Sequence, residues 1–353
     1  MGGNFPVVIQ TMWKDRLVSA DLEGEAGRAT VECIERLSRM GCGLLRFAVP
    51  DLAAAEVLGR LSGMVSMPLV ADIHFDYKIA LRCMDFPIAK IRINPGNIGG
   101  RERVRAVLDK AGEKNIPIRI GVNAGSLPPD LRDRAGALAL VEAAERELAL
   151  CDEFNFTNVI VSMKASGIAD TISANRILAG KTGVPLHIGV TEAGPLVIGT
   201  ARSGAALAML LAEGIGDTLR VSLSDSMENE CLAAREICNA AAEIAALNGG
   251  RQTADRLRRG GVTVISCPRC GRHRFDTHGF TNRWLPRLYA LDRELTVAIM
   301  GCEVNGPEEA RHADIGITGS GDKATIFRRG AVVRTVSATE ADAAFAEELG
   351  LIE

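Results

Sequence analysis

Eight short apolar runs, each followed by a stretch of helical periodicity, constrain the fold of this chain more than any other feature of its sequence. The helical stretches place apolar residues at i, i+3 and i+4, and the longest, residues 228–247, follows the eighth run. Strict alternation of strands and helices predicts a parallel sheet, and eight such units match a closed (β/α)8 TIM barrel. An open doubly wound sheet is the alternative, but no glycine-rich phosphate turn follows the first strand. The predicted strands cover residues 7–12, 44–49, 68–74, 89–94, 117–123, 159–166, 185–194 and 217–224.

The pattern changes after residue 250, where it indicates a smaller α+β domain. A helical stretch at 281–292 lies among strand-like runs at 262–267, 295–302, 314–320 and 323–336, the last of which is typical of a hairpin. The length of 353 residues suits either a large barrel alone or a barrel-sized domain with an appendage. We therefore expect a TIM-barrel substrate domain at residues 1–250, a linker near 248–261 and a second domain at residues 260–353.

The composition narrows the class of partner. A formal net charge of −3, with no long run of lysine or arginine, argues against binding to nucleic acid or to a membrane surface. No apolar run approaches the ~20 residues of a membrane span, and the N-terminus lacks the layout of a secretory signal. Nine cysteines spread along the chain do not resemble the dense framework of a small secreted domain. We expect a cytoplasmic protein with reduced thiols and a small-molecule partner.

Polar side chains at the carboxyl ends of the predicted strands are the first functional signal. Any one arginine there is explained most simply by a structural ion pair, but the strand ends offer few acids, chiefly Asp72 and Glu192. Four arginines and a lysine would leave a surplus of positive charge at the barrel mouth, and an anionic ligand would relieve it. Because arginine suits phosphate oxygens, we infer a phosphorylated substrate that bears a diphosphate. The candidate substrate-binding residues are Arg46, His74, Arg92, Arg119, Asn123, Lys164, Thr191, Arg220 and Ser222.

Three cysteines in the second domain are the other signal. Cys267 and Cys270 form a CxxC motif and Cys302 follows later, each half closing a predicted strand. Structural zinc requires a fourth nitrogen or sulfur ligand. An iron–sulfur cluster is the other interpretation, because three thiolates leave one iron for a non-cysteine ligand that substrate oxygen can displace. The candidate fourth ligands are His273 or His312 for zinc and Glu309 for iron.

Long collinear motifs in both halves of the chain resemble one known family. Over about residues 6–330, the chain is similar to the short bacterial form of the 4-hydroxy-3-methylbut-2-enyl diphosphate synthases of non-mevalonate isoprenoid biosynthesis. The motifs are VADIHFDYKIAL (70–81), IRINPGNIG (91–99), IRIGVNAGSL (118–127), VSMKAS (161–166), TEAG (191–194), GIGDTLRVSL (214–223), CPRCGR (267–272), GCEVNGPEEA (301–310) and DIGITG (314–319).

The resemblance implies a fold, a cofactor and a reaction. It implies a TIM barrel joined to a smaller α+β domain with a [4Fe-4S] cluster, fed with electrons by flavodoxin or ferredoxin. The implied reaction is the reductive ring opening and dehydration of 2-C-methyl-D-erythritol 2,4-cyclodiphosphate to 4-hydroxy-3-methylbut-2-enyl diphosphate.

The resemblance also implies site residues. It makes the nine strand-end residues substrate contacts and places Glu192 near the reacting carbon, with Glu192 or His74 as the proton donor. The implied cluster ligands are Cys267, Cys270, Cys302 and Glu309.

The chain departs from the family pattern at three places. Glu308 stands where the family has glycine, which leaves open whether Glu308 or Glu309 is the fourth ligand. Glu303 stands where the family has valine. The first loop, from Trp13 to Glu25, differs from the family's Thr- and Asn-rich stretch, so any substrate contact there is uncertain.

An alternative class of function keeps the barrel but changes the second domain. In it, the chain is a phosphate-substrate TIM-barrel lyase or binding protein whose second domain holds structural zinc.

For the cluster enzyme, the returning eighth helix would carry the chain roughly 30 Å from the mouth. We therefore expect a homodimer in which each cluster domain completes the partner's active site, an arrangement that the resemblance also implies.

Overall fold

The computed structural model describes residues 2–132, 134, 136–268, 270–291, 293–302 and 311–350. The chain divides into two compact units, residues 1–259 and 260–353, and each is described by itself. None of the helices in the described part of the chain combines the length and the apolar character that a membrane span requires.

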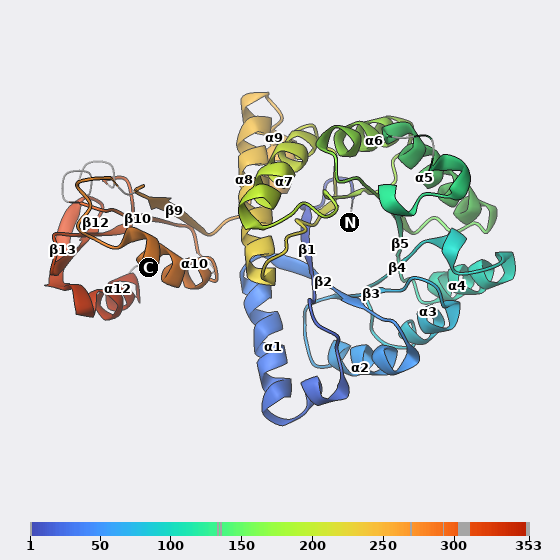
Figure 1. Cartoon of the computed structure of the whole chain (residues 1–353), viewed down its shortest axis with the longest axis horizontal. Helices are drawn as coiled ribbons and strands as arrows, with labels where there is room; N and C mark the ends of the chain where they lie inside the picture. The colour runs from blue at the N-terminus through green and yellow to red at the C-terminus, as the bar shows by residue number, and fades with distance from the viewer. Residues whose placement is uncertain are drawn as a thin grey trace. The chain divides into compact units, whose positions relative to one another are not determined.

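The first unit is built on eight parallel strands, as the sequence predicts (Figure 1). Their order is β6-β5-β4-β3-β2-β1-β8-β7. A bridge between Val161 and Leu186 connects β6 to β7 and so closes the barrel. The predicted (β/α)8 TIM barrel is therefore confirmed. The strands are β1 (Val8–Met12), β2 (Cys42–Ala48), β3 (Leu69–Asp72), β4 (Lys90–Ile93), β5 (Ile118–Asn123), β6 (Val159–Lys164), β7 (His187–Ile188) and β8 (Thr218–Leu219).

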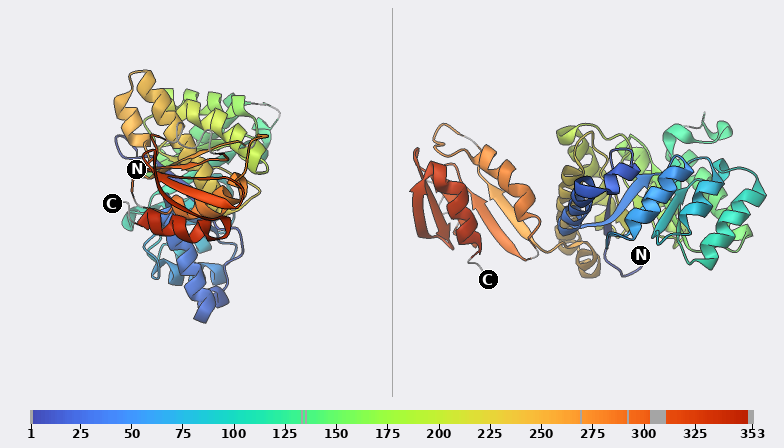
Figure 2. Two further views of the ribbon diagram at one scale, coloured as in Figure 1. Left: turned by 90° about the vertical axis from the view of Figure 1, so that its left-hand side faces the viewer. Right: turned by 90° about the horizontal axis from the view of Figure 1, so that it is seen from below.

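Helices surround the strands of this unit (Figures 1 and 2). Several begin at a side-chain cap: Asp51, Asp76 and Ser226 each accept a hydrogen bond from a backbone N–H in the first turn that follows. The helices are α1 (Gly24–Arg39), α2 (Leu52–Ser62), α3 (Tyr77–Cys83), α4 (Arg101–Glu113), α5 (Ala137–Glu153), α6 (Ile168–Lys181), α7 (Leu196–Ala212), α8 (Met227–Leu247) and α9 (Arg251–Leu257).

The two faces of the barrel wall differ in chemistry. Outward residues such as Ile91, Ile118 and Val161 join the apolar core between strands and helices. Inward positions, two residues apart along each strand, carry polar side chains that are nevertheless buried. Among them are Gln10, Lys90, Arg92, Arg119, Ser162, Lys164, His187 and Thr218. The barrel interior is therefore polar where an apolar fill is usual.

Helix α9 lies within the segment expected to be a linker. Ala254 and Leu257 are buried in the same core as the barrel helices. The amide of Val7, just before β1, donates to the Arg256 carbonyl at 3.0 Å, and Arg256 pairs with Asp217, just before β8, at 2.8 Å. The chain therefore leaves the barrel at the face where its strands begin, and the first unit extends to residue 259.

The second unit is the expected smaller α+β domain. Its sheet has the order β13-β12-β11-β10-β9, with β9, β10 and β11 parallel and the last three strands antiparallel. Helices α10 and α12 pack on it through Phe280, Trp284 and Phe345, whose rings contact one another. Figure 2 shows the two helices and the sheet as ribbons. The elements are β9 (Val262–Ser266), α10 (Thr277–Leu288), β10 (Leu295–Ile299), β11 (Ile315–Gly319), β12 (Lys323–Arg328), β13 (Ala331–Ser337) and α12 (Ala341–Gly350).

Candidate active site

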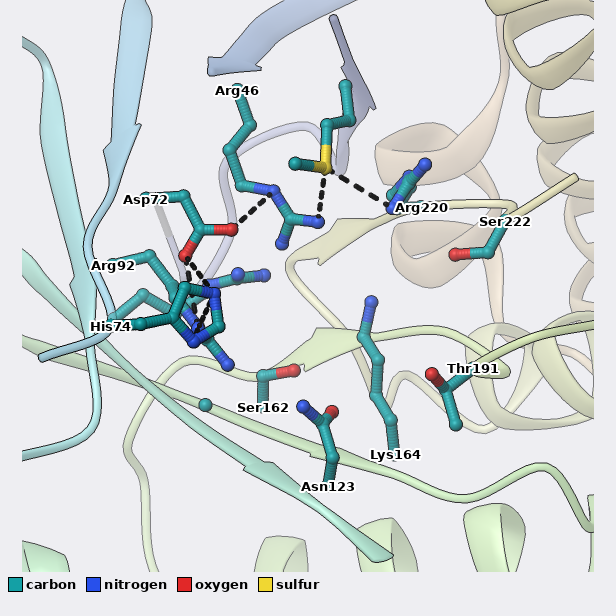
Figure 3. Close-up of a pocket in the computed structure, with 13 residues that line it drawn as sticks. Arg46, Asp72, His74, Arg92, Asn123, Ser162, Lys164, Thr191, Arg220 and Ser222 are labelled. Carbon is teal, nitrogen blue, oxygen red and sulfur yellow. Dashed lines mark hydrogen bonds and ion pairs between the residues drawn. The ribbon is translucent and has the colours of Figure 1, made fainter. Parts of the chain in front are cut away.

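A pocket of about 240 Å³ lies at the carboxyl ends of the barrel strands (Figure 3). All nine candidate substrate-binding residues line it, so the structure brings the whole predicted set together. Sequence reasoning did not assign four further lining residues to the pocket, although it had noted Asp72 as a strand-end acid. These are Met12, Asp72, Gly121 and Ser162.

Strand alternation explains why these side chains converge. Ile118 and Ile120 point into the outer core, so Arg119, Gly121 and Asn123 on the same strand face the barrel interior. Strand β6 is in register with β5, with Asn123 opposite Lys164. The inward positions at the carboxyl end of each strand therefore lie at the same level along the barrel axis and together form the wall of the pocket.

Asp72 balances the charge of one side of the pocket. Its carboxylate lies 3.0 Å from Arg92 Nη1 and 3.5 Å from Arg46 Nε (Figure 3). Burial raises the pKa of this carboxyl group, but the charges of Arg46 and Arg92 lower it further, so the net pKa lies below its ordinary value. Asp72 is therefore ionised and holds two arginines in place.

Glu230 balances the other side and comes from helix α8. It accepts from Arg220 Nη2 at 3.1 Å, from Lys14 Nζ at 2.6 Å and from Thr11 Oγ1 at 2.5 Å. Burial raises its pKa, but Arg220 and these hydrogen bonds lower it more. Lys14 belongs to the divergent first loop, so this loop contributes to the support of Arg220. Sequence reasoning missed Glu230, although it lies on the largely apolar buried face of α8.

Two cations of the pocket, Arg119 and Lys164, form no ion pair with a carboxylate of the described residues. Among the described residues, Arg119 Nε and Nη1 have no hydrogen-bond partner, although the side chain is buried. Burial and the nearby arginines hold the pKa of Arg119 and of Lys164 well below the usual values. Burial likewise lowers the pKa of Arg46 to about 10. The pocket is therefore short of negative charge, which an anionic ligand would supply.

Two glycines, one in β5 and one directly after β7, make room for Arg92 and Lys164. A Cβ on Gly121 would lie 2.6 Å from Arg92 Nε, and one on Gly189 would lie 2.7 Å from Lys164 Nζ. Both contacts are shorter than a real side chain tolerates. The guanidinium and the ammonium therefore lie flat against the backbone of the neighbouring strand, and space is left in the centre of the pocket.

The two candidate proton donors lie in different environments. His74 lines the pocket, and its ring nitrogens lie 3.1 and 3.3 Å from Arg92 Nη1. Burial lowers the pKa of His74, and Arg92 and Arg46 add to this against the opposing effect of Asp72. Glu192 is exposed with a positive φ of 51° and is not among the lining residues, although Thr191 beside it is.

In the second unit, the candidate cysteines lie in segments that follow neighbouring strands of the sheet. Cys267 follows β9 and Cys302 follows β10, and these strands are parallel neighbours. The amide of Cys267 donates to the Ile299 carbonyl at 3.0 Å, and a Cβ on Gly301 would lie 3.9 Å from Cys267 Sγ. Cys270 is exposed. Cys267 and Cys302 thus come from adjacent strand ends, but the side chains of Cys267, Cys270 and Cys302 do not lie close enough together here to hold a metal ion.

Of the candidate non-cysteine ligands, the structure describes the histidines but not Glu309. Among the described residues, no three His, Cys, Asp or Glu side chains are close enough together to hold a metal ion. His273 Nδ1 lies 2.8 Å from the Cys270 carbonyl oxygen. Glu303, Glu308 and Glu309 lie outside the described residues.

Comparisons with known proteins agree with this architecture. The model of the GcpE TIM-barrel domain matches residues 1–235, and that of the GcpE protein C-terminal domain matches residues 263–350. Relatives named 4-hydroxy-3-methylbut-2-en-1-yl diphosphate synthase (flavodoxin) are 48% identical in Treponema pallidum and 43% identical in Geobacter sulfurreducens. The first match covers 99% of this chain and 87% of the relative, and the second covers 98% and 94%. A solved dihydropteroate synthase from Coxiella burnetii has a TM-score of 0.48 at 10% identity, covering 70% of this chain and 96% of its own.

The barrel and its pocket define a TIM-barrel protein with a cluster of cationic side chains at the carboxyl ends of its strands. Both family models and the relatives identify the family within this class. The chain belongs to the GcpE family, whose matched relatives are named as the flavodoxin-type 4-hydroxy-3-methylbut-2-en-1-yl diphosphate synthases.

Proposed function

We propose that this chain converts 2-C-methyl-D-erythritol 2,4-cyclodiphosphate to 4-hydroxy-3-methylbut-2-enyl diphosphate in non-mevalonate isoprenoid biosynthesis. The observation that carries the proposal is the pocket in which Arg119 and Lys164 lie buried without a carboxylate. A cyclic diphosphate offers the anionic oxygens that these cations require. The name of the relatives supports the diphosphate product, and the cyclic diphosphate is the substrate that the family resemblance implies.

The pocket residues bind and orient this substrate. Arg46 and Arg92, held by Asp72, present their guanidinium groups from one side, and Arg220, held by Glu230, from the other. Planar guanidinium groups bind phosphate oxygens in pairs. Fixing the diphosphate on both sides leaves the carbon ring in one orientation at the open end of the pocket, which favours an oriented reaction over a random encounter.

The thiols of the second unit are the proposed cluster ligands. Cys267, Cys270 and Cys302 would hold a [4Fe-4S] cluster, with Glu309 at the fourth iron. When bound, such a cluster supplies electrons one at a time at a low potential, and the names of the relatives point to flavodoxin as their source, with ferredoxin as the alternative. Thiolate ligands require a reducing compartment, so we place the enzyme in the cytoplasm.

Glu192 is the proposed proton donor for the oxygen that leaves as water. The lowered pKa of His74 means that its imidazole is neutral near pH 7, and it already contacts Arg92. A neutral imidazole beside an arginine is a poor acid. Glu192 follows Thr191 in a strained backbone conformation at the pocket edge, which suits a side chain placed for a function rather than for packing.

We also propose that the active sites are shared in a homodimer. The substrate domain is the first unit and the cluster domain the second. Helix α8 runs 21 residues from the pocket face, roughly 30 Å, and α9 contacts the residues before β1 and β8. The chain thus leaves the barrel at the face opposite the pocket, and a two-fold dimer would give each pocket the partner's cluster domain.

An anaerobic assay with the cyclic diphosphate and reduced flavodoxin tests the proposed reaction. Formation of the hydroxymethylbutenyl diphosphate supports it, and no product with a fully loaded protein contradicts it. Iron and sulfide analysis tests the cofactor independently: a four-iron cluster gives a brown protein, whereas the alternative structural zinc gives a colourless one. Cys302→Ser should lose iron and sulfide, while Cys33→Ser, at a partly exposed thiol of the barrel, should not.

Subunit exchange tests the shared sites. Arg220→Ala disables the pocket and Cys267→Ser disables the cluster, so each homodimer should be inactive. A heterodimer of the two has one intact site and should recover part of the activity. Heterodimers confirmed by tag pull-down that stay inactive would show that each site is built within one chain.

A further inference from the structure

Lys164 differs from the other pocket cations in having a buried histidine as its partner. Its Nζ lies 3.1 Å from His187 Nε2, and His187 Nδ1 lies 2.7 Å from Thr218 Oγ1. Lys164 is 6% exposed, whereas His187 and Thr218 are fully buried. His187 and Thr218 are not among the lining residues. They lie one inward position below the pocket wall, since Gly189 and Arg220 follow them by two residues.

The hydrogen-bonding capacity of these groups restricts their protonation. An ammonium group only donates, and a neutral imidazole has one donor and one acceptor nitrogen. The contact between Lys164 and His187 therefore requires that at least one of them be uncharged. If Lys164 is an ammonium group, it donates to Nε2 and Nδ1–H donates to Thr218. If Lys164 is a neutral amine, it either accepts from Nε2–H, while the Thr218 hydroxyl donates to Nδ1, or donates to Nε2 as the ammonium does.

The surrounding charges decide between the two protonation states of Lys164. Burial, followed by the arginines, lowers the pKa of Lys164, and burial together with Lys164 lowers that of His187. The two nearby carboxylates, Asp72 and Glu230, already pair with arginines. An empty pocket therefore favours the neutral amine. The cations that face the pair are Arg46 on β2, Lys90 and Arg92 on β4, Arg119 on β5 and Arg220 after β8.

We propose that His187 is a positioning residue that presents Lys164 to the anionic substrate, and that this pair takes up one proton from solvent when the substrate binds. Phosphate oxygens supply acceptors for the ammonium form of Lys164. His187 Nε2 then accepts from Lys164, and its Nδ1–H donates to Thr218. One proton enters from solvent, no electron moves, and no heavy-atom bond changes. The identity of the anion rests on the proposed function, but the anion site does not.

Isothermal titration calorimetry of the wild-type holoenzyme tests the proton uptake without any mutation. The cyclic diphosphate is added without reductant, near neutral pH, in two buffers with different enthalpies of ionisation. Each of its phosphorus atoms carries one ester and the shared anhydride oxygen, and therefore a single strongly acidic hydroxyl, so the ligand itself does not titrate in this range. The difference in heat should correspond to about one proton taken up per bound ligand. Binding without proton uptake would overturn the inference.

A second anion separates this inference from the proposed function. Sulfate is fully ionised near neutral pH and requires no isoprenoid chemistry. If sulfate binds with proton uptake and the cyclic diphosphate does not bind, the proposed substrate is wrong and the inference holds. If the cyclic diphosphate is turned over and binds without proton uptake, the proposed substrate is right and the inference is wrong. If neither anion binds, both the anion site and the inference are wrong.

Matched variants assign the proton and the positioning role. Lys164→Met should abolish the uptake, whereas Lys90→Met should retain it, although burial lowers the pKa of Lys90 to about 7. His187→Gln keeps an amide near the place of Nε2, whereas the shorter His187→Asn reaches only toward Thr218. Asn should therefore weaken binding roughly ten-fold, and Gln by less than about three-fold. Equal affinities for these two variants, or uptake in Lys164→Met, would overturn the proposal.

Discussion

The cations of the pocket fall into two sets that differ in how their charge is balanced. Arg46 and Arg92 pair with the carboxylate of Asp72, and Arg220 pairs with that of Glu230. Arg119 and Lys164 lie on the adjacent strands, and their lowered pKa values reflect burial among like charges. The counter-charges of the first set are carboxylates of the protein itself. Under the proposed function, the second set obtains its counter-charge from the bound anion. Stability and binding should therefore respond in opposite ways to changes in the two sets.

The largest effect is expected for Asp72→Asn, which breaks the paired set. The substitution leaves Arg46 and Arg92 buried without a counter-charge, so the free energy of unfolding should fall by about 3–5 kcal/mol. Urea denaturation followed by circular dichroism measures this. Glu56→Gln is a matched control, because Glu56 pairs with Arg82 on the exposed surface, and it should change stability little. Similar losses in both variants would remove the distinction.

Arg119→Met should act in the opposite direction on the same measurement. Removing a buried cation that lacks a carboxylate should raise the free energy of unfolding of the ligand-free protein by about 1–3 kcal/mol. The same variant should bind the cyclic diphosphate more weakly. A loss of stability comparable to that of Asp72→Asn would place Arg119 in the paired set.

Arg119→Lys tests whether shape matters in addition to charge. Lysine keeps the positive charge but lacks the planar group that binds two phosphate oxygens at once. We expect KM to rise roughly ten-fold, about 1.4 kcal/mol, with a smaller change in kcat. Steady-state assays under anaerobic conditions measure both. An unchanged KM would indicate that Arg119 has a structural role only.

The Asp72 carboxylate also predicts a dependence of stability on acid pH. The pKa of Asp72 is lowered in the folded state, so its contribution to stability is fully present above the unfolded value of about 3.9 and is lost as pH falls through the folded value. The stability difference between wild type and Asp72→Asn should therefore shrink toward zero in strong acid. Urea midpoints at neutral and acid pH measure this, and a constant difference would contradict it.

Much of the barrel could be predicted because its chemistry is periodic. Strand alternation in residues 118–123 places Arg119 and Asn123 on one face, and the structure finds both in the pocket. The same rule works for Lys164 and Arg220. It needs only local sequence, because the carboxyl ends of barrel strands meet wherever the barrel closes.

The charge balance could not be predicted, because it depends on contacts between distant residues. Glu230 lies 216 residues from Lys14 in sequence, yet its carboxylate accepts from it. Its spacing from Ala234, Ile237 and Ala241 places it on the buried face of α8. An acid among buried apolar positions is the one signal in the sequence, and it does not reveal which cations the acid pairs with. His187 was counted within a strand, but its partners lie on β6 and β8.

The closure of the barrel between β6 and β7 has a consequence for how the protein can be observed. Six residue pairs join β5 to β6, whereas in the described residues one isolated bridge and a few loop hydrogen bonds join β6 to β7. Lys164 and His187 connect the same two strands through their side chains. Amide hydrogens near Val161 and Leu186 should therefore exchange with deuterium faster than those of β5, and slow when an anion charges Lys164. Mass spectrometry of deuterium uptake at this junction would then show whether the pocket is occupied. The measurement would require no loaded cluster, no electron donor and no detection of product.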